Sequence, residues 1–229
     1  YDASKGLTLG AAVPCYKIYQ DETLSAAYPG LMDSATLIGG IQIQGRASIG
    51  GNICNAAPSG DAIPAVIALG GICNVAGPNG TREIPVEDFC TAPGRNALEN
   101  GELLVSISLP APQANSGANY LRFIPRNEMD IAVAGVGSSV VLDGSGQNFV
   151  SARIALASVA PTPVFAKAAG DSLAGKTVSE ESIQQASELA QAAAKPISDM
   201  RGTVRQRTHL IGVLTRRTLN NAIERARGG

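Results

Sequence analysis

The stretch SIGGNICNAAPSGD, from Ser48 to Asp61, joins paired glycines to small polar residues and ends in an acid before an apolar run. Gly50 and Gly51 permit positive φ and leave the main chain open to a ligand. The freed amides, with the neighbouring Ser and Asn side chains, can donate to pyrophosphate, ribose or flavin ring atoms. An alternative interpretation is a Gly-Gly turn, with Asp61 as the N-cap of the helix that follows.

The spacing of this stretch matches neither of two common phosphate-binding motifs. No Lys-Ser/Thr pair follows the glycines, as a P-loop requires, and no Gly-x-Gly-x-x-Gly follows a strand. From the residues alone, a ligand-binding loop and an ordinary turn are therefore equally good interpretations.

The composition of the chain indicates a folded protein of one large domain or two small ones, with 229 residues. Hydrophobic residues make up 45% and charged residues 16%, which allows an extensive core. The net charge of −1 gives no reason to expect nucleic acid or a membrane surface as a partner. We find no apolar segment typical of a transmembrane span and no signal peptide, which favours a cytoplasmic location.

The cysteines and the histidine predict no metal site. Cys15, Cys54, Cys73 and Cys90 lack the close spacing of zinc or iron–sulfur ligands, and reduced, buried thiols are expected. His209 is the only histidine, and we expect a structural role for it. No side-chain constellation for catalysis is found either, so no catalytic residue is assigned.

Periodicity and turn signals predict an α+β first part of the chain. In residues 1–112 we expect a strand within 6–16, helical segments around the quoted stretch, a strand–turn–strand unit in 70–89 and a strand at 102–110. The polar segment QANSGAN, residues 113–119, is the predicted linker.

The second part is predicted to contain three strands followed by helices. The strands are expected in YLRFIPR, IAVAGVGSSVVLD and FVSARIALASVA. One helix starts at the proline of TPVFAKAAGDSLAG, and the next has Thr177 and Glu180 spaced as a capping box. The last helix places five apolar residues on an arc of roughly 140°: Ile211, Leu214, Leu219, Ala222 and Ala226.

Together these segments resemble a known family. ASIGGNICNAAPSGD closely resembles the second FAD-binding motif in the flavin subunits of molybdenum hydroxylases, which include carbon monoxide dehydrogenase medium chains and the FAD domain of xanthine dehydrogenases. The similarity continues in order through GLTLGAAV, YPGLMDSATLIGGIQIQGRASIGGN, ELLVSISLP, YLRFIPRNEMDIAVAGVG and PISDMRGTVRQRTHLIGVLTRRTLNNAI. It therefore covers nearly the whole chain.

The resemblance implies an α+β fold in two domains. Residues 1–112 would be the second subdomain of a PCMH-type FAD-binding domain with a mixed sheet. Residues 118–229 would be a carbon monoxide dehydrogenase flavoprotein-like C-terminal domain, with an antiparallel three-stranded sheet and a helical bundle. The implied partners are a molybdopterin-binding large subunit and a [2Fe–2S] small subunit. Electrons would pass from the clusters through FAD on this chain to an external acceptor.

The resemblance also places ten residues against FAD. Asn55 would face the isoalloxazine ring and Asp61 the adenosine or ribityl side. Leu104 would contribute a backbone contact and Arg122 a basic side chain, although a core role for Leu104 and a structural role for Arg122 remain open. The implied contacts are Ile38, Ser48, Ile49, Gly50, Gly51, Asn52, Asn55, Asp61, Leu104 and Arg122.

Two expectations concern charged residues outside this set. Arg126 and Asp130 match a family Arg…Asp element and are expected to form an ion pair. The arginines in residues 201–227 form a basic stretch without interleaved stacking aromatics. A solvated helix face, or a surface for an acidic partner subunit, is therefore favoured over a nucleic-acid site.

Family members begin with a further FAD-binding subdomain that carries an Ala-Gly-Gly motif, which has no match in this sequence. Losing half the contacts of FAD, which has about 50 heavy atoms, at about 0.3 kcal/mol each costs on the order of 7 kcal/mol, or about five decades in affinity. The 229 residues by themselves are therefore expected to bind FAD weakly or not at all and to be inactive. Two alternatives stay open: a flavin-free docking fragment of such a complex, and another FAD-dependent oxidoreductase of the same fold.

Overall fold

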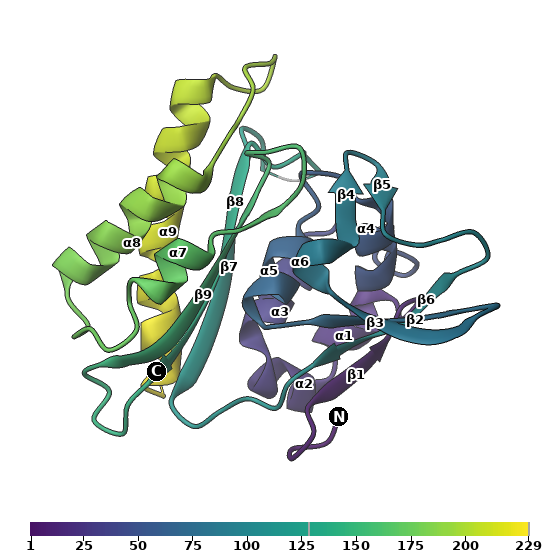
Figure 1. The fold of residues 1–229 in the computed structure, drawn as a ribbon, viewed down its shortest axis with the longest axis horizontal. Helices are drawn as coiled ribbons and strands as arrows, with labels where there is room; N and C mark the ends of the chain where they lie inside the picture. Colours follow the sequence, from purple (N-terminus) through teal and green to yellow (C-terminus); the bar gives the residue numbers. More distant parts are fainter. Residues whose placement is uncertain (128, 229) are drawn as a thin grey trace.

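A computed structural model describes residues 1–127 and 129–228 (Figure 1). The first part forms a sheet in the order β1-β6-β2-β3 and a small hairpin of β4 and β5. We expected a mixed sheet, but all the pairings described for it are antiparallel. Because a tight turn joins β2 to β3, these two strands can only run in opposite directions. The strands are β1 (Leu7–Gly10), β2 (Ile72–Gly77), β3 (Gly80–Pro85), β4 (Cys90–Ala92), β5 (Arg95–Asn96) and β6 (Leu103–Leu109).

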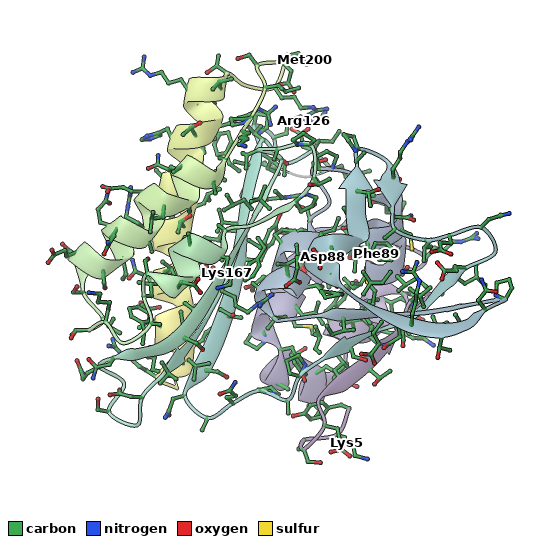
Figure 2. The ribbon with its side chains drawn as sticks, viewed as in Figure 1. Lys5, Asp88, Phe89, Arg126, Lys167 and Met200 are labelled. Carbon is green, nitrogen blue, oxygen red and sulfur yellow. The ribbon has the colours of Figure 1, made fainter. Side chains whose placement is uncertain are left out.

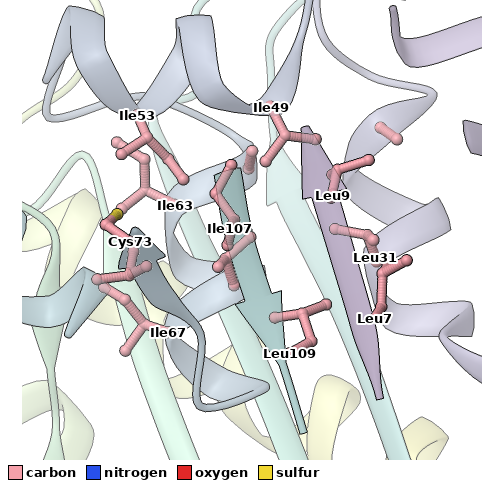
Figure 3. Close-up of a cluster of buried hydrophobic side chains, with 14 of the residues drawn as sticks. Leu7, Leu9, Leu31, Ile49, Ile53, Ile63, Ile67, Cys73, Ile107 and Leu109 are labelled. Atoms are coloured by element: carbon pink, nitrogen blue, oxygen red, sulfur yellow. The ribbon is translucent and has the colours of Figure 1, made fainter. Parts of the chain in front are cut away.

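Short helices cover one face of this sheet and fill the region between it and the second part. Figure 3 shows the core between helices and sheet, where Ile49, Ile53, Ile63 and Ile67 lie close to Ile107. Burial of these aliphatic side chains fixes the helices that carry the quoted motif. The helices are α1 (Cys15–Tyr19), α2 (Glu22–Ala27), α3 (Pro29–Ala35), α4 (Ile49–Asn55), α5 (Ala62–Ala68) and α6 (Val86–Phe89).

The second part forms an antiparallel sheet in the order β10-β9-β8-β7. A two-residue fourth strand, β10, occupies the expected start of a helix, because Val164 and Phe165 pair with β9. The expected linker 113–119 is also shorter than predicted. Its second half pairs with β8 from Ser116 onward, since ladder hydrogen bonds need only the backbone. The strands are β7 (Ser116–Phe123), β8 (Ala134–Leu142), β9 (Phe149–Ala157) and β10 (Val164–Phe165).

Three helices follow: α7 (Lys167–Asp171), α8 (Glu180–Ala193) and α9 (Val204–Ala226). The capping box of α8 uses Ser179 and Ser182 rather than Thr177 and Glu180. Thr177 instead forms an isolated bridge with Asn148, so the helix starts two residues later. The apolar face predicted for α9 is confirmed, because all five of its residues are buried.

The elements stack in four layers (Figure 1). The α+β fold that the sequence predicts is confirmed. Helices α7–α9 cover one face of the β7–β10 sheet, helices α3 and α5 cover the other, and the β1-β6-β2-β3 sheet lies beyond them. Gly137 of β8 permits the close approach of α5, because a Cβ there would lie 2.6 Å from the Pro64 carbonyl oxygen. In the described part of the chain, the helices are too short or too polar to span a bilayer.

Candidate functional site

The paired glycines belong to a helix and not to a turn. The Ser48 side chain caps α4, and its Oγ accepts from the Gly51 amide at 3.0 Å. Both glycines have helical φ angles, so neither uses the positive φ that glycine permits. Gly50 instead allows close packing, since a Cβ there would collide with the backbone of Ala11. Gly51 lies on the exposed side of the first turn.

The expected cap of α5 is also supplied by a different residue. Asp61 occupies the N-cap position without accepting a capping hydrogen bond. The Asn52 Oδ1 atom accepts from the Ala62 amide at 3.0 Å instead, which ties α4 to the start of α5. Between the helices, Ala56 adopts a left-handed conformation (φ 48°). This turn was missed because such a conformation is uncommon for alanine.

Asp61 is held by two residues of β7. Its Oδ1 accepts from the Tyr120 hydroxyl at 2.7 Å, and its Oδ2 accepts from Arg122 Nη1 at 2.6 Å. The side chains of Asp61 and Arg122 are 11% and 7% exposed. Burial raises the pKa of the Asp61 carboxyl, while the Arg122 charge and the Tyr120 hydroxyl act in the opposite direction. Burial, followed by the neighbouring carboxylate, raises the pKa of Tyr120 well above its ordinary value.

The hydrogen bond to Asp61 does not use all the N–H donors of Arg122. Its Nη1 makes a long contact of 3.4 Å with the Asp130 carbonyl oxygen. Its Nε is buried and has no partner within residues 1–127 and 129–228. A buried donor without an acceptor is costly, so the pairing of Arg122 with Asp61 leaves one guanidinium donor unsatisfied.

The expected Arg126–Asp130 ion pair is confirmed, with Nε 3.3 Å from Oδ2. The Asp130 carboxylate also pairs with Arg201 at 2.8 Å, a contact that the sequence did not indicate. Figure 2 shows Arg126 and the exposed Met200 at the same end of the molecule. The Arg126 and Arg201 hydrogen bonds lower the pKa of Asp130.

The basic stretch 201–227 is not simply a solvated face, which corrects that expectation. Arg207 is buried, pairs with both Asp199 oxygens at 2.7 and 2.8 Å, and donates to the Val133 and Ser158 carbonyls. Arg225 reaches Asp33, over a sequence separation that no local pattern encodes. His209 is exposed, so the structural role expected for it is wrong.

The remaining sequence-predicted residues lie in different settings. Ile38 and Ile49 are buried in the core, whereas Asn55 is exposed at the end of α4. Leu104 is half-buried and packs on the core side of β6. The pairing of β6 with β2 contains a bulge at Asn74/Val75, which shifts the alternation of inward-facing and outward-facing side chains along β6.

The expectation of reduced, buried thiols is confirmed in part. All four cysteines are free, but only Cys15 and Cys73 are fully buried, and Cys54 and Cys90 are half-buried. Burial raises the pKa of Cys15 to about 11 and that of Cys73 to about 12, so both stay protonated at neutral pH. Across the described residues, no three His, Cys, Asp or Glu side chains gather to hold a metal ion.

The site has features that suit a dinucleotide with a flavin. The exposed Gly51 places no side chain over the backbone at the N-terminal end of α4, and Arg122 places a guanidinium beside Asp61 at the start of α5. Hydrogen bonds connect the residues of α4 and the start of α5 to Arg122 of β7. The residues that they bring together are Ser48, Gly51, Asn52, Asp61 and Arg122.

Comparison with known proteins identifies the family. Residues 2–112 match the model of the FAD binding domain in molybdopterin dehydrogenase, and residues 119–222 match that of the CO dehydrogenase flavoprotein C-terminal domain. The chain belongs to the family of molybdenum hydroxylase flavoprotein subunits.

Relatives in this flavoprotein family align with nearly the whole chain. The carbon monoxide dehydrogenase medium chain of Afipia carboxidovorans is 34% identical over 96% of this chain and 76% of its own. The putative xanthine dehydrogenase FAD-binding subunit of Escherichia coli K12 is 30% identical over 97% and 76%. The structure of carbon monoxide dehydrogenase from Hydrogenophaga pseudoflava aligns with a TM-score of 0.92 at 32% identity, covering 98% of this chain and 77% of that one. FAD is accordingly the cofactor of this flavoprotein chain.

Proposed function

We propose that this flavoprotein subunit holds FAD between the [2Fe–2S] clusters of a small subunit and an external electron acceptor. A molybdopterin-binding large subunit is inferred as the site of substrate oxidation, and the cytoplasm as the location. The observation that carries the proposal is the meeting of the α4–α5 motif with Arg122, whose guanidinium pairs with Asp61 at the start of α5.

The roles of individual residues follow from this proposal. The amides at the start of α4 and the Arg122 guanidinium would bind the cofactor, and the aliphatic residues Ile38, Ile49 and Leu104 would shape its surroundings. Bound FAD supplies the redox chemistry, so the chain needs no acid, base or nucleophile of its own. We also propose a division into domains at residues 1–112 and 118–229, both of which contribute to the site.

The proposal can be tested with Gly51→Asp in the full-length subunit assembled with its partners. An acid in the first turn suits the helix dipole, but it repels the anionic pyrophosphate of FAD. We expect the FAD dissociation constant, measured by flavin absorption, to rise at least tenfold while the thermal midpoint stays within a few degrees. Gly144→Asp is the matched control, because that glycine faces open space in a loop.

The electron route requires a second measurement. Reducing the [2Fe–2S] clusters of the wild-type assembly should bleach its visible flavin absorption and reduce an added electron acceptor, whereas a flavin-depleted assembly should leave the acceptor oxidised. A wild-type assembly that contains no flavin would favour a docking role for this chain instead.

A further inference from the structure

The last turn of the motif helix α4 is completed by a side chain from elsewhere in the chain. If the helix continued, the Cys54 carbonyl would accept from the amide four residues on, but that residue is Pro58, which has no N–H. The Asn96 side chain supplies the missing donor, with its Nδ2 2.8 Å from the Cys54 oxygen. The end of α4 therefore depends on a residue 42 positions away.

Asn96 belongs to the hairpin of β4 and β5, which lies beside α4 (Figure 1). The base of this hairpin is fixed to the core, because Phe89 is fully buried and its carbonyl accepts from the Ala97 amide at 2.8 Å. At the tip of the hairpin, the Gly94 amide donates to the Ala56 carbonyl at 3.0 Å. The hairpin thus holds the end of α4 at two points, through the Asn96 side chain and the Gly94 backbone.

Asn55 lies between the two carbonyls that the hairpin holds. It is the last residue of α4 and is exposed, four positions after the exposed Gly51, so the two residues share one face of the helix. The next residue, Ala56, has a left-handed backbone (φ 48°), which a residue other than glycine keeps only where its surroundings enforce it. The direction of the Asn55 side chain therefore depends on a backbone that the hairpin fixes.

We infer that Asn96 is a positioning residue of the flavin site, whose amide fixes the end of α4 so that Asn55 is presented to the cofactor before it binds. This inference rests on the proposed function, in which the motif helix binds FAD. Without the bond from Asn96, the turn after α4 is looser in the flavin-free protein and has to be ordered when FAD binds. That ordering lowers the affinity for the cofactor.

The test compares Asn96→Ala with Asn74→Ala in the full-length subunit within its complex. Asn74 is the matched control, because it is also half-buried and donates two side-chain hydrogen bonds, to Ser106 and Ser108 at 3.0 and 2.8 Å. We expect Asn96→Ala to raise the FAD dissociation constant about fivefold, the loss typical of one neutral hydrogen bond. It should also speed amide hydrogen exchange in residues 56–60 of the flavin-free protein. Asn74→Ala should change neither quantity.

Two further variants connect the effect to the Cys54 bond and to Asn55. Asn96→Asp keeps the oxygen that accepts from the Leu98 amide at 3.1 Å but loses the donor to Cys54, so it should weaken FAD binding at least as much as Asn96→Ala. Asn55→Ala should weaken binding as well, and adding Asn96→Ala to it should have little further effect. Such non-additivity is the signature of two substitutions that act through one contact. If Asn96→Ala fails to fold, Asn96→Asp takes its place in both backgrounds.

The possible outcomes separate positioning from a structural role. A purely structural Asn96 would lower the unfolding temperature and leave the FAD affinity as in Asn74→Ala, which would overturn the inference. Additive effects of Asn55→Ala and Asn96→Ala, or an Asn96→Asp variant that binds FAD like the wild type, would also overturn it. A wild-type complex without flavin would instead refute the proposed function beneath it.

Discussion

At the scale of single residues, Asp61 shows what a local pattern can and cannot define. An acid before an apolar run predicts a helix start, and α5 does start at the next residue. The acid does not cap it, because Tyr120, 59 residues further along, offers a buried hydroxyl, and Arg122 offers a charge. Asn52 takes over the capping bond. Only the fold brings these partners together, so the sequence pattern assigns the position of Asp61 but not its contacts.

Asp61→Asn should lower the free energy of unfolding by about 3 kcal/mol, because it leaves the buried Arg122 guanidinium without its counter-charge. Chemical denaturation followed by circular dichroism measures this loss. Asp171→Asn is the control, since its pair with Lys167 (Figure 2) is 60% and 69% exposed and contributes less than about 1 kcal/mol. Equal losses in the two variants would contradict the buried-pair argument.

At the scale of helices and strands, periodicity performed well wherever packing alone sets the structure. It identified the buried face of α9, from Ile211 to Ala226, because that face follows the helical repeat. It failed at the start of α8 and in the linker, where Thr177 bridges to Asn148 and Ser116 pairs with Val141. Such contacts between distant backbone segments leave no periodic trace in the sequence.

The contact between β7 and α9 depends on a glycine. A Cβ at Gly117 would collide with the Ala222 carbonyl and the Ala226 amide, which are backbone atoms and cannot rotate away. Gly117→Ala should therefore destabilise the protein by about 2–3 kcal/mol through overpacking. Gly144→Ala, which meets no atom within 4 Å, should change the thermal midpoint little. A Gly117→Ala variant as stable as Gly144→Ala would show that α9 can move away from the sheet at little cost.

The β8–β9 turn predicts a specific pH dependence. Hydrogen bonds from Asn148 and Ser145 hold the pKa of Asp143 far below its ordinary value. The stabilisation from this carboxylate is complete above its unfolded pKa of about 4 and is lost as the pH falls toward the folded value. Asp143→Asn should therefore lower the melting temperature at neutral pH, and the difference from wild type should shrink in strongly acidic buffer. A difference that is constant with pH would exclude an ionic contribution.

At the scale of the whole molecule, the two parts of the chain interlock through charged contacts that composition did not reveal. The Arg225 guanidinium of α9 donates to both carboxylate oxygens of Asp33, at 2.6 and 2.9 Å. The Arg153 side chain donates to the Glu87 carboxylate at 2.8 Å. Ala155 of β9 lies in the same hydrophobic cluster as the flavin-motif helices. Several arginines of the basic stretch 201–227 therefore form ion pairs and hydrogen bonds within the fold, among them Arg201, Arg207 and Arg225.

This interlocking predicts that the 229-residue chain unfolds as one unit despite its two family segments. Helix α5 packs on β8 and β9 as well as on the first core, so loss of either sheet exposes the same apolar face. Calorimetry should give equal calorimetric and van't Hoff enthalpies. Arg225→Lys, which keeps the charge but loses the two-point grip on Asp33, should lower the free energy of unfolding by about 1–2 kcal/mol without splitting the transition. Arg217→Lys on the exposed face of α9 is the control and should have almost no effect. Two resolved transitions in the wild type would contradict the prediction, because they would mean that the flavin motif and the strand carrying Tyr120 and Arg122 fold independently.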